Sequence, residues 1–223
     1  MIYEIYHETK FDYASLVTFS HNIARLKPKN STTQKLLEYS LHIEPKPYET
    51  SEFIDYFENT NNFMLIRESH KTLKVITKSK VERIESEINK QLESLKNITI
   101  KVGEAKERLN KYYKDDVLAK LFLFETESIP TPSSQIKEYI LESFSDEKNL
   151  YSATYEFIGR IFNDFDFVSG FTDITTPIEV VFKEKKGVCQ DFAQFAISAL
   201  RSIGIPTRYV SGYIQTIPAE GKE

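Results

Sequence analysis

The sequence predicts an α+β protein: an N-terminal antiparallel β-sandwich-like domain, followed by an α+β core around one buried central helix. Three observations support this prediction. From residue 1 to about 80, β-branched and aromatic residues recur with a period of two between turn-forming stretches. After Pro130 and Pro132 the apolar residues take helical spacing instead. Near the end, one segment is apolar nearly all round, which is typical of a buried helix.

The first domain is assigned to residues 1–130. Thr72–Thr77 is a representative strand, because Leu73 and Val75 would face one way while Thr72, Lys74 and Lys78 largely face the other. Val81–Asn97 has apolar residues at helical spacing among Glu, Lys and Gln, so we interpret it as a helix inside this domain. The two prolines near residue 130 suit a linker, which assigns the second domain to residues 131–223.

Two helices are predicted early in the second domain. Ser133 or Ser134 can cap a helix that ends at Phe144. Ser152 can cap another helix that ends near Phe162.

Gly187–Gly204 is the predicted central helix. Gly204 can take the left-handed conformation just past its end, and Pro206 prevents continuation. Arg208–Ile214 then alternates like a strand. Six side chains of the helix segment should be largely buried: Phe192, Phe195, Ala196, Ala199, Leu200 and Ile203.

Composition and charge exclude several classes of protein. Of the 223 residues, 40% are hydrophobic and 28% are charged, which suits one or two soluble globular domains. The net charge of −4 is spread along the chain without a lysine or arginine cluster, so nucleic acid is not an expected partner. The sequence has neither a run of about 18 apolar residues nor a signal peptide, so we expect a cytoplasmic protein without a membrane partner.

Cys189 is the only cysteine, and two interpretations of it remain open. A single cysteine cannot form an intramolecular disulfide, and zinc sites need several ligands at close spacing, so no metal or cofactor is expected. A lone cysteine in an apolar helix is most often a small buried side chain. At the first turn of a helix, however, unpaired N–H groups and the helix dipole favour the thiolate, which is the reactive form.

The neighbours of Cys189 bear on this choice. Gly187 would leave room for the backbone of a substrate to approach. The charge of Asp191 would disfavour a thiolate unless its carboxylate caps the helix, so we predict a structural role for it.

Two stretches closely resemble the core of bacterial transglutaminase-like proteins, which have a papain-like fold: Lys186–Ala193 and Ala199–Tyr213. The motif, the helix length, the Gly-Ile-Pro break and the following strand agree in order. Four stretches at the front resemble the β-sandwich domain that precedes this core: His7–Tyr13, Ser20–Pro28, Leu41–Pro45 and His70–Val75. The resemblance is weakest from about residue 84 to 130.

The resemblance implies a Cys-His-Asp triad that acts on amide bonds of peptides or proteins through a thioester, without a cofactor. Only the cysteine is carried over, onto Cys189. In the family the histidine and aspartate lie on strands that follow the one ending here near Tyr213, and no histidine follows Cys189. The chain is therefore expected to stop short of its triad and to be inactive by itself.

Other candidates for catalysis are interpreted as structural. All four histidines lie in the predicted β domain, where each is expected to be an ordinary strand or turn residue: His7, His21, His42 and His70. Asp164, Asp166 and Asp173 are expected to be solvated or to cap turns. Aromatic residues between Tyr151 and Phe171 could line an acyl groove, but at this density they are usually core.

Two functional hypotheses follow. The first is a thiol-dependent protease, amidase or acyltransferase that uses Cys189; the choice between water and an amine as acceptor cannot be made from the sequence. The alternative is a non-catalytic peptide- or protein-binding scaffold that keeps the fold without the triad.

Overall fold

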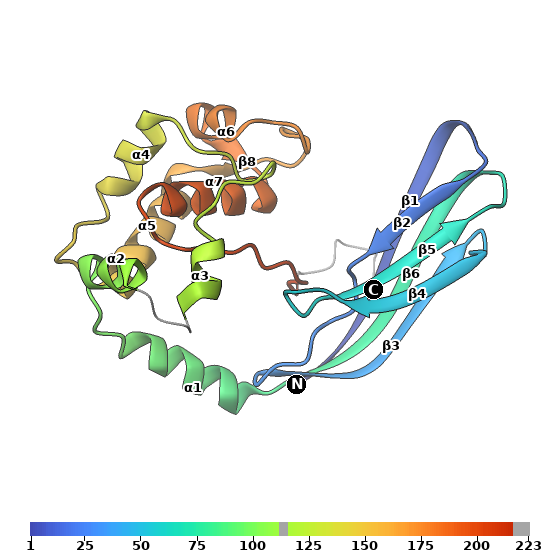
Figure 1. The fold of residues 1–223 in the computed structure, drawn as a ribbon, viewed down its shortest axis with the longest axis horizontal. Coiled ribbons are helices and arrows are strands. Elements are labelled where there is room, and N and C mark those ends of the chain that lie inside the picture. The colour runs from blue at the N-terminus through green and yellow to red at the C-terminus, as the bar shows by residue number, and fades with distance from the viewer. Residues whose placement is uncertain (112–115, 216–223) are drawn as a thin grey trace. The chain divides into compact units, whose positions relative to one another are not determined.

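The chain divides into two compact units, Met1–Glu93 and Ser94–Glu223, in a computed structural model that describes residues 1–111 and 116–215 (Figure 1). The division falls well before the predicted boundary at 130/131. The prolines around which that boundary was drawn lie inside the second unit: Ile129 is buried, and the Ser198 hydroxyl donates to the Pro130 carbonyl at 2.6 Å.

The first unit consists of two three-stranded antiparallel sheets. One has the order β1-β6-β3, with strands Ile2–Val17, His70–Arg83 and Gln34–Glu44. The other has the order β2-β5-β4, with strands Ser20–Ala24, Thr60–Ile66 and Glu49–Ile54.

The two sheets share one hydrophobic core. Met64 and Ile66 of β5 pack in a single buried cluster with Ile43 of β3 and with Leu73 and Val75 of β6. Each sheet thus buries one face against the other, which is the β-sandwich arrangement that the alternating pattern predicts. The predicted strand Thr72–Thr77 lies within β6, and Leu73 and Val75 face the core.

Helix α1, Glu85–Lys96, confirms a helix near the end of the first unit, but it begins later than the predicted Val81. Val81 still belongs to β6, where it pairs with both Tyr3 and Leu36. Strand pairing on two sides therefore overrides helical spacing at these residues. No residue of α1 is buried.

The second unit contains six helices and one short sheet among its described residues. The helices are α2 Val102–Asn110, α3 Val117–Leu121, α4 Ser134–Leu141, α5 Leu150–Asp164, α6 Ile178–Glu184 and α7 Cys189–Ser202. Strands β7, Asp166–Phe167, and β8, Lys186–Gly187, pair in parallel. No helix among the described residues is long and apolar enough to cross a membrane.

Helix α7 is the centre of this unit and lies among α4, α5 and α6 in Figure 1. Five of its six predicted core residues are buried, and Phe192 is partly buried against the same cluster. Gly204 has a φ of 83°, as predicted for the residue just past the helix. The cluster also contains Val102 of α2, which explains why residues 94–130 join this unit instead of the sandwich.

Three local predictions differ from the structure. Helix α4 has Ser133 at its N-cap as predicted but ends at Leu141, before Phe144. Helix α5 begins before Ser152, because the Asn149 side chain caps it by accepting from the Ser152 N–H at 2.9 Å. Residues 208–214 form no strand, since the described residues provide no partner strand for them.

Candidate active site

Cys189 is the first residue of α7, and its side chain is exposed. Cys189 is therefore not the small buried side chain that a lone cysteine in an apolar helix most often is. The residue before it, Val188, is the N-cap and has an extended backbone. The thiol therefore lies at the end of α7 where the helix dipole and unpaired N–H groups favour negative charge.

Asp191 holds the start of α7 in place. Its side chain is buried, with only 4% of the residue exposed, and one carboxylate oxygen, Oδ2, accepts two hydrogen bonds. The Val188 N–H donates to it at 2.7 Å and the Thr172 hydroxyl at 2.5 Å. The first bond is an N-terminal cap, so the predicted structural role of Asp191 is confirmed.

Gly187 makes room for Asp191, and the prediction that it makes room for a substrate is wrong. Gly187 is buried, and a Cβ built on it would lie 2.9 Å from Asp191 Oδ2 and 3.2 Å from Phe192 Cε1. Any side chain there would displace the capping carboxylate. The glycine is thus required by the packing beneath the helix start.

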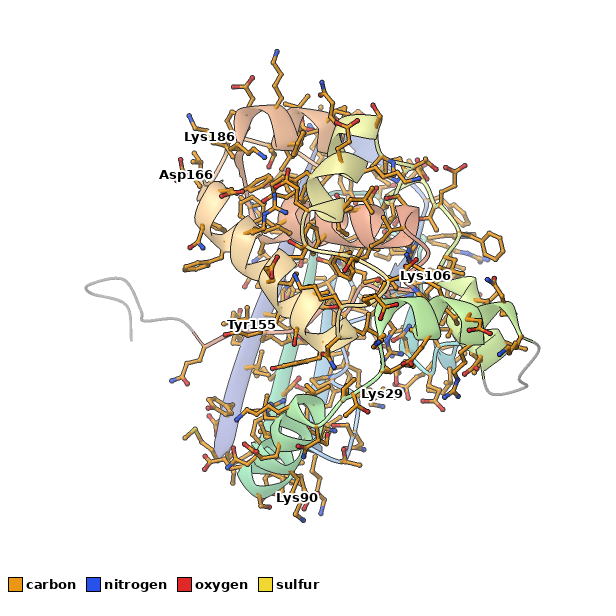
Figure 2. The ribbon with its side chains drawn as sticks, turned by 90° about the vertical axis from the view of Figure 1, so that its left-hand side faces the viewer. Lys29, Lys90, Lys106, Tyr155, Asp166 and Lys186 are labelled. Carbon is orange, nitrogen blue, oxygen red and sulfur yellow. The ribbon has the colours of Figure 1, made fainter. Side chains whose placement is uncertain are left out.

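Strands β7 and β8 fix the chain that enters α7. The Asp166 N–H donates to the Lys185 carbonyl at 2.8 Å, and the Val168 N–H donates to the Gly187 carbonyl at 2.9 Å. The labelled side chains of Asp166 and Lys186, which are paired in the register, lie at the same edge of the unit in Figure 2. Asp166 is exposed, as expected of a solvated carboxylate.

Lys185 ends α6 in an unusual way. Its φ of 54° is left-handed, a conformation that costs a non-glycine residue about 1 kcal/mol. Its ammonium lies 3.9 Å from the ring centre of Phe182 and 4.4 Å from those of Tyr139 and Phe165. These cation–π contacts offset the backbone strain. Burial lowers the pKa of Lys185.

Tyr139 links the same cluster to Asp164. Its hydroxyl donates to Asp164 Oδ2 at 2.6 Å, and the Arg160 guanidinium lies 4.0 Å from its ring centre. Burial, followed by the hydrogen bond to the Asp164 carboxylate, raises the pKa of Tyr139. Asp164 therefore has a structural role. Asp173 does too, since it accepts from the Thr175 N–H at 2.8 Å.

The histidines are all in the sandwich and are held by nearby residues. His7 contacts the Thr9 hydroxyl at 3.0 Å, His42 contacts Glu44 at 2.9 Å and His70 contacts the Glu68 carbonyl at 2.7 Å. The His21 ring lies near those of Phe19 and Phe63. No histidine belongs to the unit that carries Cys189.

The described residues contain no group of three or more His, Cys, Asp and Glu side chains that could hold a metal ion. The aromatic residues of the region divide into two sets. Phe157 and Phe165 are core residues, whereas Tyr155, Phe162 and Phe167 are exposed. Tyr155 is labelled on α5 in Figure 2.

Sequence reasoning missed two residues that position the site. Thr172 and Lys185 act through contacts that no local pattern reveals. Thr172 contacts Asp191 from 19 residues away, and Lys185 contacts the Tyr139 and Phe165 rings of two other segments. A lysine in a Lys- and Glu-rich stretch normally indicates a solvated surface.

Two family descriptions match the chain. Residues 3–82 match the "bacterial transglutaminase-like N-terminal region", and residues 137–221 match the "transglutaminase-like superfamily". These ranges coincide with the sandwich and with the region from α4 onwards, including Cys189.

Similar whole proteins occur in mycobacteria. Uncharacterized proteins of Mycobacterium tuberculosis and Mycobacterium bovis are each 30% identical over 223 residues, which is 99% of this chain and 68% of theirs. An uncharacterized protein of Mycobacterium leprae is 28% identical over 211 residues, covering 94% of this chain and 70% of its own length.

A crystal structure has the same fold. It is that of a protein from Cytophaga hutchinsonii described as a "putative cysteine protease", with a TM-score of 0.66 and 19% identity. The likeness covers 92% of this chain and 67% of that one. At this level of identity it shows the fold, a sandwich followed by a papain-like α+β core.

Proposed function

Because the chain belongs to the bacterial transglutaminase-like proteins, we propose that Cys189 is the nucleophile of a cysteine enzyme acting on amide bonds of peptides or proteins. The observation that carries the proposal is the place of Cys189: exposed, first in α7, and preceded by a capped and tightly packed turn. A scaffold would not require a thiol at the one helix end that favours a thiolate.

The proposed reaction has two stages. The Cys189 thiolate attacks the amide carbonyl, forming a C–S bond and a tetrahedral oxyanion that N–H groups at the start of α7 can stabilise. The C–N bond then breaks, the nitrogen leaves with a proton from a general acid, and a thioester remains. Water or a second amine attacks the thioester, which restores the thiol and gives hydrolysis or transamidation.

Both stages need a proton-transferring base, and the described residues around Cys189 provide none of the family's histidine type. Asp166 is exposed, and Asp164 and Asp173 are bound in structural hydrogen bonds. We therefore propose that residues 1–223 alone form a thioester slowly from amides and release it slowly. Removing a triad base typically lowers kcat by several orders of magnitude.

The test combines labelling with turnover. Iodoacetamide should label Cys189 in the folded chain, as located by peptide mass mapping, and Cys189→Ser should abolish the label. Ammonia release from glutamine peptides measures acylation by either route, and the mass of the peptide product formed with and without added primary amine then separates transamidation from hydrolysis. A thiol that is no more reactive in the folded chain than in urea would count against the proposal.

The second candidate is the non-catalytic scaffold, and the location of every histidine in the sandwich favours it. It predicts that Cys189→Ala binds peptides as tightly as the parent, and that no acyl group is ever transferred to the protein. Equilibrium binding of both forms to a peptide library distinguishes the two functions.

A further inference from the structure

We propose that the loop Val168–Thr172 forms one wall of the substrate site, and that Phe171 selects a peptide with an apolar side chain next to the residue whose carbonyl reacts. The proposal deepens the proposed function and rests on Cys189 being the nucleophile. It names the substrate class, which is an apolar peptide segment.

The loop is fixed on both sides of Cys189. At its first residue, the Val168 N–H donates to the carbonyl of Gly187, two residues before the cysteine. At its last residue, the Thr172 hydroxyl donates at 2.5 Å to Asp191, two residues after the cysteine. A chain advances at most about 3.5 Å per residue, so the three residues between these anchors must stay close to the start of α7.

The loop is also shaped before any ligand binds. The Phe171 N–H donates to the Val168 carbonyl at 3.3 Å, which closes a four-residue turn. Gly170 is the third residue of this turn and has a φ of 77°, a conformation for which glycine is preferred. The anchor at Asp191 is itself buried. The wall is thus preorganised, which reduces the ordering that binding requires.

The wall exposes part of two apolar side chains. Phe171 is 39% exposed and Val168 is 36% exposed, and neither belongs to the buried core of the unit. A Cβ added at Gly170 would meet no atom within 4 Å, so the space above the turn is open. Val168 and Phe171 therefore offer exposed apolar surface that an apolar side chain of a peptide can cover.

Two peptide electrophiles test this without requiring turnover. Both carry a chloroacetamide that alkylates Cys189; one has phenylalanine next to the reactive group and the other has aspartate. Labelling rates of the intact chain, each divided by the iodoacetamide rate, should differ by roughly tenfold in favour of phenylalanine. In Phe171→Ala the ratio should fall towards one, whereas Phe171→Leu should keep most of the preference.

Phe162→Ala is the matched control, since Phe162 is 84% exposed in the same unit and should not alter the ratio. Thr172→Val should reduce the preference by releasing one anchor, and Thr172→Ser should retain it. Far-UV circular dichroism and melting curves confirm that each variant folds. If the two peptides labelled the parent equally while Cys189 reacted with iodoacetamide, this inference would be overturned and the proposed function would not. A folded Cys189 inert to all three reagents would overturn the proposed function and this inference together.

Discussion

Polar side chains near α7 make different contacts from those along the exposed strands of the sandwich. In the sandwich, pairs such as Lys10–Asp12 and His42–Glu44 join residues two apart on one strand and lie exposed. In the second unit, the polar contacts near α7 join distant segments: Thr172 with Asp191, and Ser198 with the Pro130 carbonyl. Exposed pairs contribute little to stability, whereas partners of buried groups are costly to remove. The precise placement of Cys189 therefore depends on packing that only the second unit contains.

The largest expected effect comes from placing the same charge at a buried position of α7 and at an exposed position of the sandwich. Ala196 is buried in α7, so Ala196→Asp places an unpaired charge in the core and should cost about 3 kcal/mol or more, which unfolds the second unit at moderate temperature. Ala14 lies exposed on β1, and Ala14→Asp should leave the melting temperature nearly unchanged. Calorimetry of the two variants measures the contrast. If Ala196→Asp and the parent melted at the same temperature, the placement of α7 in the core would be contradicted.

A smaller effect is expected at two glycines within the second unit. In Gly187→Ala the new methyl would press on Asp191, so the variant should lose about 1–3 kcal/mol of unfolding free energy and label more slowly with iodoacetamide. Gly159 is inside α5 with no atom within 4 Å of its Cβ position, so Gly159→Ala should gain up to about 1 kcal/mol. Urea unfolding measures both changes. A Gly187→Ala variant as stable as the parent would show that the packing under Cys189 is looser than described.

Lys185 should show a more modest effect. Lys185→Met keeps much of the side-chain length but loses the charge over the three rings, and should destabilise the unit by about 1 kcal/mol. Lys185→Arg keeps a cation that can stack on aromatic rings and should be close to the parent. Thermal melts at equal ionic strength compare the two. A methionine variant as stable as the arginine variant would show that the ring contacts contribute nothing.

The smallest expected effect is on the stability of the folded state at acidic pH. Hydrogen bonds from Thr175, then from Thr176, hold the pKa of Asp173 below its usual value. Its carboxylate therefore stabilises the folded state above about pH 4, and that contribution is lost as the pH falls through the lower folded-state pKa. Asp173→Asn should melt slightly below the parent at pH 7, and the gap should close as the pH approaches 2. A gap that widens in acid would contradict the assigned hydrogen bonds.

Strands and helices could be predicted from the sequence where a single local pattern of residues determined them. The alternation around Leu73 and Val75 gave the sandwich strand correctly, and the apolar run with Gly204 after it gave α7. The compact units divide at Glu93/Ser94 and not near Pro130, because prolines indicate a turn but not whether that turn packs against a core, as this one does on Ser198. Local chemistry alone could not anticipate such contacts.

The same distinction holds at the site. Cys189 could be proposed as the candidate nucleophile from the sequence because its helix, the glycine before it and the family motif all lie within a few residues. Capping by Asp191 followed from its third position in the helix. Thr172 and Lys185 could not be predicted, since their contacts join side chains distant in the sequence: Asp191 for Thr172, and Tyr139 and Phe165 for Lys185.

The central claim is that Cys189 is an acyl-transfer nucleophile, and intact-mass analysis after incubation with an activated acyl ester tests it most directly. An activated ester needs no general acid to release its leaving group, and the unit offers no histidine to promote deacylation. We predict that one acyl group accumulates on Cys189 of the folded chain, severalfold faster than in urea, that hydroxylamine removes it, and that Cys189→Ser never acquires a hydroxylamine-labile group at this rate. Acylation of the folded chain that is no faster than that of the unfolded chain would contradict the claim.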